Sequence, residues 1–226
     1  MAVSISYRLA PQYKFPTASH DSLDSIKWIA DHASELGADP TKGFIVGGVS
    51  AGGTQAAVIT TQAVKDKLAH PITGQWLSIP SLMSLDNVPA KYKSYLLAAE
   101  HNVDVPVLPL QALVDISKHV EWDDDSPLRW PVLSDAPLSS LPPTFLQSDG
   151  LDPLRDDALI YEEMLKEAGV PTRINFYPGC PHAHFALFPG IEVTNRAVAD
   201  IMTGMGWLLG KEITPEQGLG GLAPSA

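Results

Sequence analysis

A serine within a glycine-rich run is the residue of this chain best suited to nucleophilic chemistry. Ser50 lies in GVSAGG (residues 48–53), between an apolar run and a helix-forming stretch. The pattern predicts a nucleophile elbow, a tight strand-to-helix turn that exposes a serine oxygen. Gly48, Gly52 and Gly53 supply the small residues of such a turn, whose serine backbone is strained and whose flanking segments approach closely. A passive serine in a glycine-rich turn explains these residues equally well unless an acid and a base follow.

Candidate partners for the serine follow further along the chain. A serine hydroxyl is a poor nucleophile until an imidazole accepts its proton, and the imidazole needs a carboxylate that fixes its tautomer and stabilises its cation. Four aspartates lie in DGLDPLRDD (residues 149–157), and His182 and His184 lie in GCPHAHF (residues 179–185). Both segments follow an expected strand, as Ser50 does, so loops at one edge of the sheet can bring all three groups together.

Asp152 is the carboxylate that we expect to orient the imidazole. Pro153 fixes the chain immediately after it, at the point where a helix begins. Asp156 and Asp157 fall in the first turn of that helix, where acidic residues offset the positive end of the helix dipole. Asp149 remains a less favoured alternative.

The base is one of two histidines. His182 and His184 are two residues apart on the same loop, and the residue types alone do not choose between them. The other histidines fall on helices or surface-like stretches and have ordinary explanations: His20, His32, His70, His101 and His119. Cys180 is the single cysteine, which excludes an internal disulfide and favours a small buried thiol.

Short β-type runs alternate with helical stretches along the chain, which predicts an α/β fold with a mostly parallel sheet covered by helices on both faces. We expect five strands, over residues 3–7, 44–47, 76–79, 144–148 and 173–177. Apolar residues at helical spacing predict helices over residues 23–33, 54–68, 158–168 and 193–209. Gly37 and Gly169 end the first and third of these helices, and Gly204 and Gly206 interrupt the last.

Residues 81–141 break this alternation and are expected to form an insertion folded over the sheet. Such a segment on the loop side of an α/β sheet shapes a substrate pocket, because ligands bind beyond the carboxyl ends of the strands. Its acidic triplet, residues 123–125, has no histidine or further carboxylate at ligand spacing, so we assign no metal and no cofactor. Residues 1–210 are expected to form one α/β domain, and residues 211–226 a disordered tail because they lack any apolar period.

Composition limits the classes of partner. The 226 residues are 45% hydrophobic and 18% charged, which allows a sizeable core. A formal net charge of -11 disfavours binding to nucleic acid or to an anionic membrane surface, since either would need clustered lysines and arginines. No apolar run reaches membrane-spanning length and no targeting signal is visible, so we expect a cytoplasmic protein with a small-molecule substrate.

The order serine, aspartate, histidine is that of α/β-hydrolases. Four stretches resemble the hormone-sensitive-lipase-like family of serine esterases within that superfamily: YRLAPQ with FP (residues 7–16), GVSAGG (48–53), DPLRD (152–156) and YPGCPH (177–182). The resemblance covers about residues 3–209 and implies Ser50 as nucleophile, Asp152 as catalytic aspartate and His182 as base. The departures are Gln12, Val49 and His184, where the family usually has glutamate, aspartate and phenylalanine.

Members of this family carry a His-Gly-Gly-Gly loop upstream of the YRLAP stretch, and its N–H groups complete the oxyanion hole; the given sequence begins after that point. The N–H of Ala51, next after Ser50, is the donor that remains. One missing donor typically costs about 2.7–4 kcal/mol of transition-state stabilisation. The family's sheet also has a strand between the YRLAP strand and the elbow strand. We therefore expect a shortened form of a longer esterase, in which residues 3–7 pair directly with residues 44–47 or leave a gap.

Together these features predict a serine carboxylic-ester hydrolase that acts through an acyl-enzyme on a small-molecule ester or lactone. The YPGCPH stretch resembles fungal members of the family, some of which process esters and lactones in secondary metabolism. The alternative is a catalytically weak or inert hydrolase-like protein that retains the pocket for binding. A serine peptidase of the prolyl-oligopeptidase type shares the elbow and the residue order but fits the YRLAP and DPLRD stretches less well.

Overall fold

The centre of the fold is a parallel sheet. In the computed structural model, which describes residues 1–220, its strands run in the order β1-β2-β3-β4. They are β1 (Ile45–Val49), β2 (Gly74–Ser78), β3 (Thr144–Leu151) and β4 (Thr172–Pro181). Strands β2 and β3 are buried along most of their length, as expected for parallel strands covered on both faces. The predicted α/β class is confirmed, and these strands form close to four of the five predicted positions.

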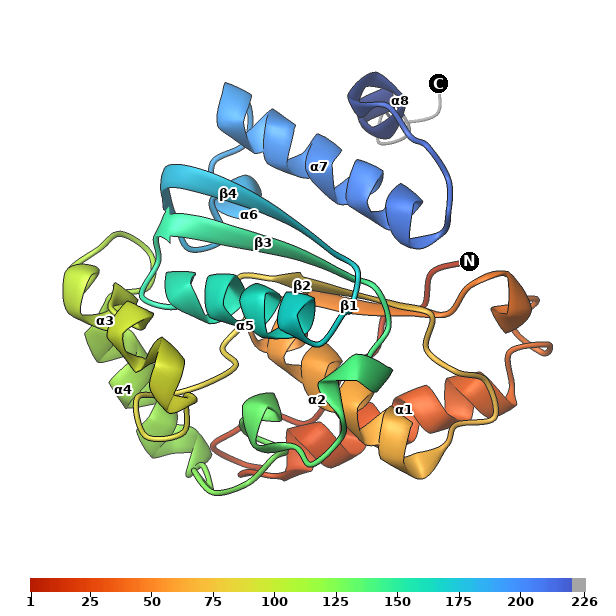
Figure 1. Cartoon of the computed structure of the whole chain (residues 1–226), viewed down its shortest axis with the longest axis horizontal. Coiled ribbons are helices and arrows are strands. Elements are labelled where there is room, and N and C mark those ends of the chain that lie inside the picture. Colours follow the sequence, from red (N-terminus) through yellow and green to blue (C-terminus); the bar gives the residue numbers. More distant parts are fainter. Residues whose placement is uncertain (221–226) are drawn as a thin grey trace.

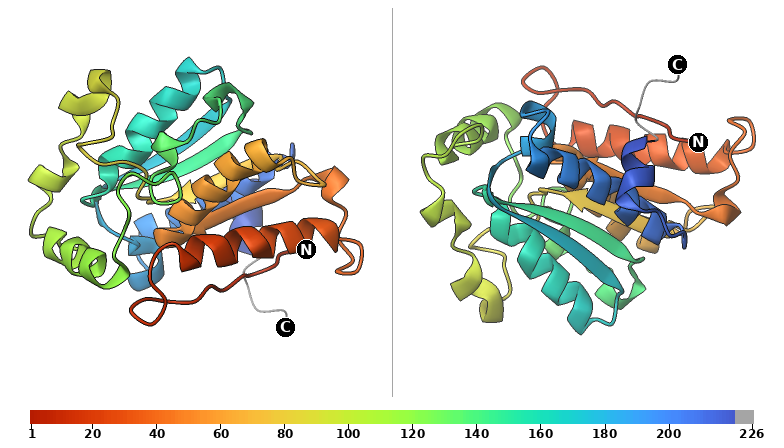
Figure 2. Two further views of the ribbon diagram at one scale, coloured as in Figure 1. Left: turned by 90° about the horizontal axis from the view of Figure 1, so that it is seen from below. Right: turned by 90° about the horizontal axis from the view of Figure 1, so that it is seen from above.

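Helices cover both faces of this sheet (Figure 1). Helix α2 (Ala51–Asp66) packs against β1 and β2, helix α5 (Arg155–Glu167) against β3 and β4, and helix α1 (Thr17–Asp31) against α2. Helix α7 (Glu192–Leu208) crosses the opposite face, where it meets β2, β3 and β4 (Figure 2). The shorter helices are α3 (Ala98–His101), α4 (Leu110–Val120), α6 (His184–Leu187), α8 (Pro215–Gly220) and the 3₁₀ helices η1 (Pro40–Lys42), η2 (Ala90–Tyr95), η3 (Pro131–Leu133) and η4 (Leu138–Ser140). Within residues 1–220, no helix has the length and apolar character that a membrane crossing needs.

The main core lies between the sheet and the helices α2 and α5. Ile59 of α2, Leu77 of β2, Leu146 of β3 and Leu165 of α5 are all almost completely buried. Burial of one such side chain contributes about 1.5–3 kcal/mol. Because this core holds both helices against the strands, it fixes the loops at the carboxyl ends of the strands, where the predicted site residues lie.

The prediction of a strand over residues 3–7 is wrong. Within residues 1–220 no strand pairs with the outer edge of β1, and residues 1–9 have no regular structure. Arg8 instead holds this segment to α1, because its Nε and Nη2 donate to the Asp21 carboxylate at 2.9 and 2.7 Å. An alternating pattern becomes a strand only where its backbone groups meet a partner strand, and the anchor of this segment is a helix.

Helix α7 continues through Gly204 and Gly206, although the sequence predicts an interruption at these glycines. A Cβ at Gly204 would lie 2.7 Å from Cγ of Phe145, and a Cβ at Gly206 would lie 2.8 Å from Cγ1 of Ile213. The interruption was wrongly predicted because these glycines permit close packing. The packing outweighs the low helix propensity of glycine, which is about 1 kcal/mol less favourable than alanine in a helix.

The C-terminal segment differs from the disorder predicted for residues 211–226. Residues Pro215–Gly220 form α8, which packs against α7, and Gly218 is buried in this contact. Residues 221–226 lie outside the described residues. The disorder prediction relied on the lack of an apolar period, whereas single side chains such as Ile213 are enough to dock a short segment on an existing helix.

The insertion between β2 and β3 is fastened to α5 by two buried aspartates. Asp156 Oδ2 accepts hydrogen bonds from the N–H groups of residues 97–98, and Asp157 Oδ1 accepts from those of residues 82–83, at distances of 2.6 to 3.1 Å. Both aspartates lie in the first turn of α5, as expected. Their interaction with the helix dipole is therefore only part of their explanation, because they also fix the first part of the insertion, at residues 82–83 and 97–98.

Candidate active site

Ser50 occupies the turn between β1 and α2, as the elbow prediction requires. Its φ of 54° and ψ of -119° lie outside the regions that residues other than glycine normally adopt. Such a conformation costs about 1–3 kcal/mol and persists only where its surroundings enforce it. The N–H of Ser50 donates a 2.8 Å hydrogen bond to the carbonyl of Ser78 at the end of β2, which holds the strained turn against the sheet.

The glycines around Ser50 have different roles. A Cβ at Gly48 would lie 2.8 Å from Cα of Gly52, and a Cβ at Gly53 would lie 3.1 Å from the carbonyl oxygens of Gly48 and Ser78. A Cβ at Gly52 would meet nothing within 4 Å. The expected need for small residues therefore holds at Gly48 and Gly53, whereas Gly52 has open space.

The structure brings Ser50, His182 and Asp152 into one hydrogen-bonded chain. His182 Nε2 lies 2.8 Å from Ser50 Oγ, and His182 Nδ1 lies 2.6 Å from Asp152 Oδ2. Asp152 is completely buried and His182 is 7% exposed. An ionised carboxylate accepts from Nδ1–H, which leaves Nε2 free to accept the serine proton. This arrangement can make Ser50 a nucleophile.

Asn102 supports the aspartate loop, although its residue type and sequence neighbours do not mark it as a site residue. Its side-chain Nδ2 donates to the main-chain carbonyls of Asp152 at 2.8 Å and Gly150 at 3.3 Å, and the residue is 4% exposed. Leu154 N–H donates to Asp152 Oδ1 at 2.9 Å. No local pattern marks Asn102, because it reaches the loop from the insertion, about fifty residues earlier in the chain.

The alternative acid and base, Asp149 and His184, lie against each other. His184 Nδ1 is 2.9 Å from Asp149 Oδ1, in a contact that is not aligned as a hydrogen bond. Both residues are 1% exposed, and the His184 ring packs against Tyr177 and Phe185. Burial raises the pKa of Asp149, and His184 partly opposes this shift. The two alternatives therefore form a second, fully buried pair that is separate from the Asp152–His182 pair.

Cys180 has the buried position expected of it. It is 6% exposed and packs with Tyr177 and Ala197. Burial raises the pKa of its thiol, which disfavours the reactive thiolate form.

A cavity of about 400 Å³ opens at Ser50 and Ala51. Most of its wall comes from residues 81–141, where the sequence predicts a substrate pocket. Its apolar lining includes Leu85, Leu96, Leu108, Leu113, Ile116 and Trp130. Ala51 is the first residue of α2, so its N–H has no acceptor within the helix, and the helix N-terminus favours negative charge.

Comparison with known proteins identifies the family to which this chain is similar. A family model described as alpha/beta hydrolase fold matches residues 1–186. Versiconal hemiacetal acetate esterase of Dothistroma septosporum is 37% identical over 92% of this chain and 64% of its own length. Esterase LipI of Mycobacterium tuberculosis is 34% identical over 88% of this chain and 61% of its own length.

A solved structure shows the same similarity in three dimensions. The crystal structure of vibralactone cyclase superposes with a TM-score of 0.86 at 35% identity, and the match covers 91% of this chain and 60% of that chain. The chain thus spans less than two thirds of the length of these proteins. Since the family model and the relatives cover most of the chain, it belongs to the hormone-sensitive-lipase-like family of the α/β-hydrolase superfamily.

Proposed function

We propose that this chain carries the catalytic centre of a serine carboxylic-ester hydrolase that acts on a small-molecule ester or lactone. The observation that carries the proposal is the hydrogen-bonded chain from Asp152 through His182 to Ser50, at the mouth of a largely apolar cavity. The esterase names of two relatives support ester hydrolysis, and the name of vibralactone cyclase supports a lactone as a further substrate class.

The geometry supports an acyl-enzyme mechanism. Ser50 Oγ attacks the ester carbonyl while His182 Nε2 takes the serine proton, and His182 returns that proton to the leaving alcohol oxygen as its bond to the acyl carbon breaks. A water molecule then attacks the acyl-serine, with His182 again accepting a proton and returning it to Ser50 as the acid leaves. Asp152 holds Nδ1–H and stabilises the imidazolium, and Ala51 N–H donates to the oxyanion.

A serine-directed probe and a matched pair of variants test this proposal. The purified chain, Ser50→Ala and the exposed control Ser94→Ala are treated with a fluorophosphonate probe and assayed on p-nitrophenyl acetate and butyrate. We expect the chain and Ser94→Ala to be labelled and active, and Ser50→Ala to be unlabelled with kcat lower by a factor of about 10³ or more.

Two other outcomes are informative. Labelling without turnover indicates an activated serine whose oxyanion hole is too weak for catalysis, which is the weak or inert alternative. A folded chain that shows neither labelling nor turnover contradicts the enzyme proposal; circular dichroism and a cooperative urea transition establish that the sample is folded.

A further inference from the structure

Arg129 places a positive charge in the wall of the cavity that opens at Ser50. The residue is half-buried, and its guanidinium lies between two indoles, 3.6 Å from the ring centroid of Trp130 and 4.3 Å from that of Trp122. Both tryptophans line the same cavity. Stacking on two flat rings holds the planar guanidinium in a fixed orientation and stabilises its charge.

The guanidinium of Arg129 has no acceptor in the described part of the chain. Among residues 1–220 it forms neither a hydrogen bond nor an ion pair, and its Nε is buried without a partner. Burial lowers the pKa of Arg129 to about 10, so the group remains charged at neutral pH. A charged group whose Nε–H is buried without an acceptor is unfavourable unless another molecule supplies an oxygen atom.

The acidic residues of the cavity do not fill this role. Asp157 attracts Arg129 only at longer range, its Oδ1 accepts from the N–H groups of residues 82–83, and burial raises its pKa to about 7. Asp124 is exposed and accepts from Nε1–H of Trp130 at 3.3 Å. Glu100 is also exposed, so solvent screens its charge. Among the charged side chains of the described residues that line the cavity, Arg129 is therefore the one with a buried donor that lacks a partner.

We propose that Arg129 is a specificity-determining residue that binds a carboxylate group of the substrate, remote from the ester that Ser50 attacks. A carboxylate matches the two parallel N–H donors of a guanidinium, and such charged hydrogen bonds are stronger than neutral ones. Arg129 and Ser50 line the same largely apolar cavity, which accommodates the hydrocarbon that separates the two groups. This inference rests on the proposed function and names its substrate class, which is the half-ester of a dicarboxylic acid or an ester of a hydroxy acid.

Charged and neutral esters of the same shape test the proposal. On the acyl side, mono-p-nitrophenyl glutarate is compared with its methyl ester; on the alcohol side, 4-(butyryloxy)benzoate is compared with its methyl ester. The readout is the ratio of kcat/KM for the charged ester to kcat/KM for its neutral partner, so a general loss of activity cancels. We expect this ratio to favour the charged ester by about tenfold or more in one of the pairs, mainly through KM.

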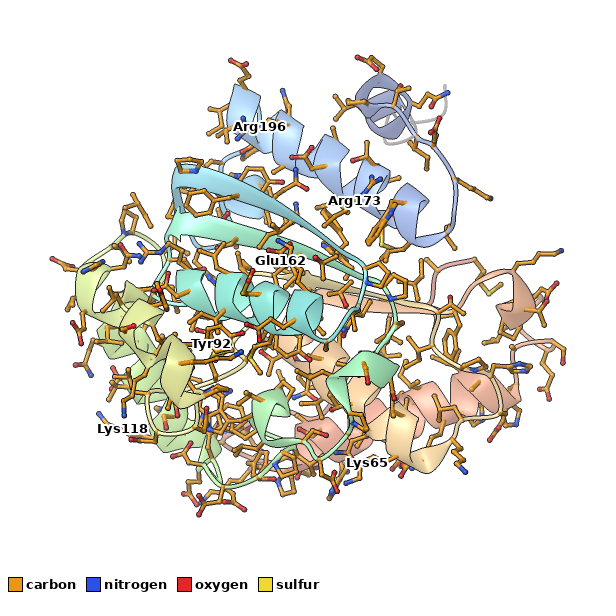
Figure 3. The ribbon with its side chains drawn as sticks, viewed as in Figure 1. Lys65, Tyr92, Lys118, Glu162, Arg173 and Arg196 are labelled. Atoms are coloured by element: carbon orange, nitrogen blue, oxygen red, sulfur yellow. The ribbon has the colours of Figure 1, made fainter. Side chains whose placement is uncertain are left out.

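Three variants isolate the effect of the guanidinium on this preference: Arg129→Leu, Arg129→Lys and Arg173→Leu. We expect Arg129→Leu to abolish the preference and Arg129→Lys to retain part of it, since a lysine keeps the charge without the planar fork. Arg173 of β4 is a matched control, because its guanidinium also lies over an indole, 4.9 Å from the Trp207 centroid, but near α7 and outside the cavity lining (Figure 3). Arg173→Leu should keep the ratio of the unaltered chain.

Binding separates a failure of this inference from a failure of the proposed function. In the Ser50→Ala background, tryptophan fluorescence measures the affinity for each ester with and without Arg129→Leu. Tighter binding of the charged ester that disappears in Arg129→Leu supports the inference even if the chain shows no turnover. Equal affinity for charged and neutral esters, or a preference that survives Arg129→Leu, overturns it, whether or not the esters are hydrolysed.

Discussion

Two aspartate–histidine pairs lie at the carboxyl ends of strands β3 and β4, and one of them reaches Ser50. The Asp152–His182 pair touches the serine oxygen, whereas Asp149 and His184 are buried against each other and against the ring of Tyr177. At the residue scale, both pairs are buried, and they differ in whether the histidine contacts Ser50. His182 Nε2 lies 2.8 Å from Ser50 Oγ, whereas the His184 ring packs against Tyr177 and Phe185.

The two aspartates can be compared directly by substitution. We expect Asp152→Asn to lower kcat by a factor of about 10⁴, because the amide no longer holds the histidine tautomer that accepts the serine proton. We expect Asp149→Asn to reduce the free energy of unfolding while kcat falls by less than about tenfold, since Asp149 does not touch His182. Steady-state kinetics and urea denaturation measure both quantities. An equal loss of kcat in the two variants contradicts this assignment of the pairs.

Asp157 gives the stability of the fold a definite pH dependence. Burial raises its pKa to about 7, above the value of about 3.9 that an unfolded chain has, so the folded state holds this proton more tightly. The contribution of Asp157 to the free energy of unfolding is therefore fully present below about pH 4. It is lost as the pH rises to about 7, at up to about 1.4 kcal/mol per pH unit.

Asp157→Asn isolates this contribution, because the amide oxygen can still accept the two N–H bonds of residues 82–83 while the charge is absent. We expect the difference in unfolding free energy between the two proteins to change in favour of the variant as the pH rises from 4.5 to 7.5. Urea denaturation at several pH values measures it. Parallel stability curves for the two proteins would show that the carboxyl group has no raised pKa.

At the scale of elements, the elbow depends on the close approach of β1 and α2. Gly48 faces the backbone of Gly52, with no space for a side chain, and Ser50 is held in its strained turn by the carbonyl of Ser78. The same strand and helix are fixed by the core, so the turn cannot relax without moving both.

The glycines of the elbow offer a matched pair of substitutions. We expect Gly48→Ala to lower the free energy of unfolding by about 1–3 kcal/mol or more, because its Cβ overlaps backbone that cannot move aside. Gly52→Ala should leave this free energy unchanged or raise it by up to about 1 kcal/mol, since the site is open and alanine favours the helix. Urea denaturation of both variants gives the comparison; similar losses would contradict the close approach at Gly48.

At the scale of the whole molecule, the C-terminal segment joins the layer formed by α7. Ile213 lies against Gly206, and α8 packs against α7 with Gly218 beside Met202. These contacts extend the layer on the face of the sheet opposite α2 and α5 (Figure 1).

Substitution of Ile213 tests this docking. We expect Ile213→Ala to lower the free energy of unfolding by about 1–2 kcal/mol, because the lost side chain leaves space beside Gly206. Leu219→Ala is the control, since Leu219 is 40% exposed and should change stability by less than about 0.5 kcal/mol. Urea denaturation and amide hydrogen exchange in α7 report the effect. Equal effects at the two positions would count against a docked segment.

The sequence by itself determined the elements and the place where they meet. The run GVSAGG after an apolar strand predicts the turn at Ser50, and the carboxylate and histidine segments each follow another strand. In a parallel sheet the carboxyl ends of the strands lie at one edge, so local patterns were enough to predict which loops form the candidate site.

Tertiary structure decided the features that depend on residues far apart in the chain. The pairing of Asp152 with His182 and of Asp149 with His184 follows from the register of two loops, and Asn102 and Arg129 reach the site from the insertion. Residues 3–7 lack a strand partner although their pattern alternates. Periodicity reports which face of a segment is apolar, but the partner that covers this face is fixed only when the chain has packed, because packing contacts join residues that no local pattern relates.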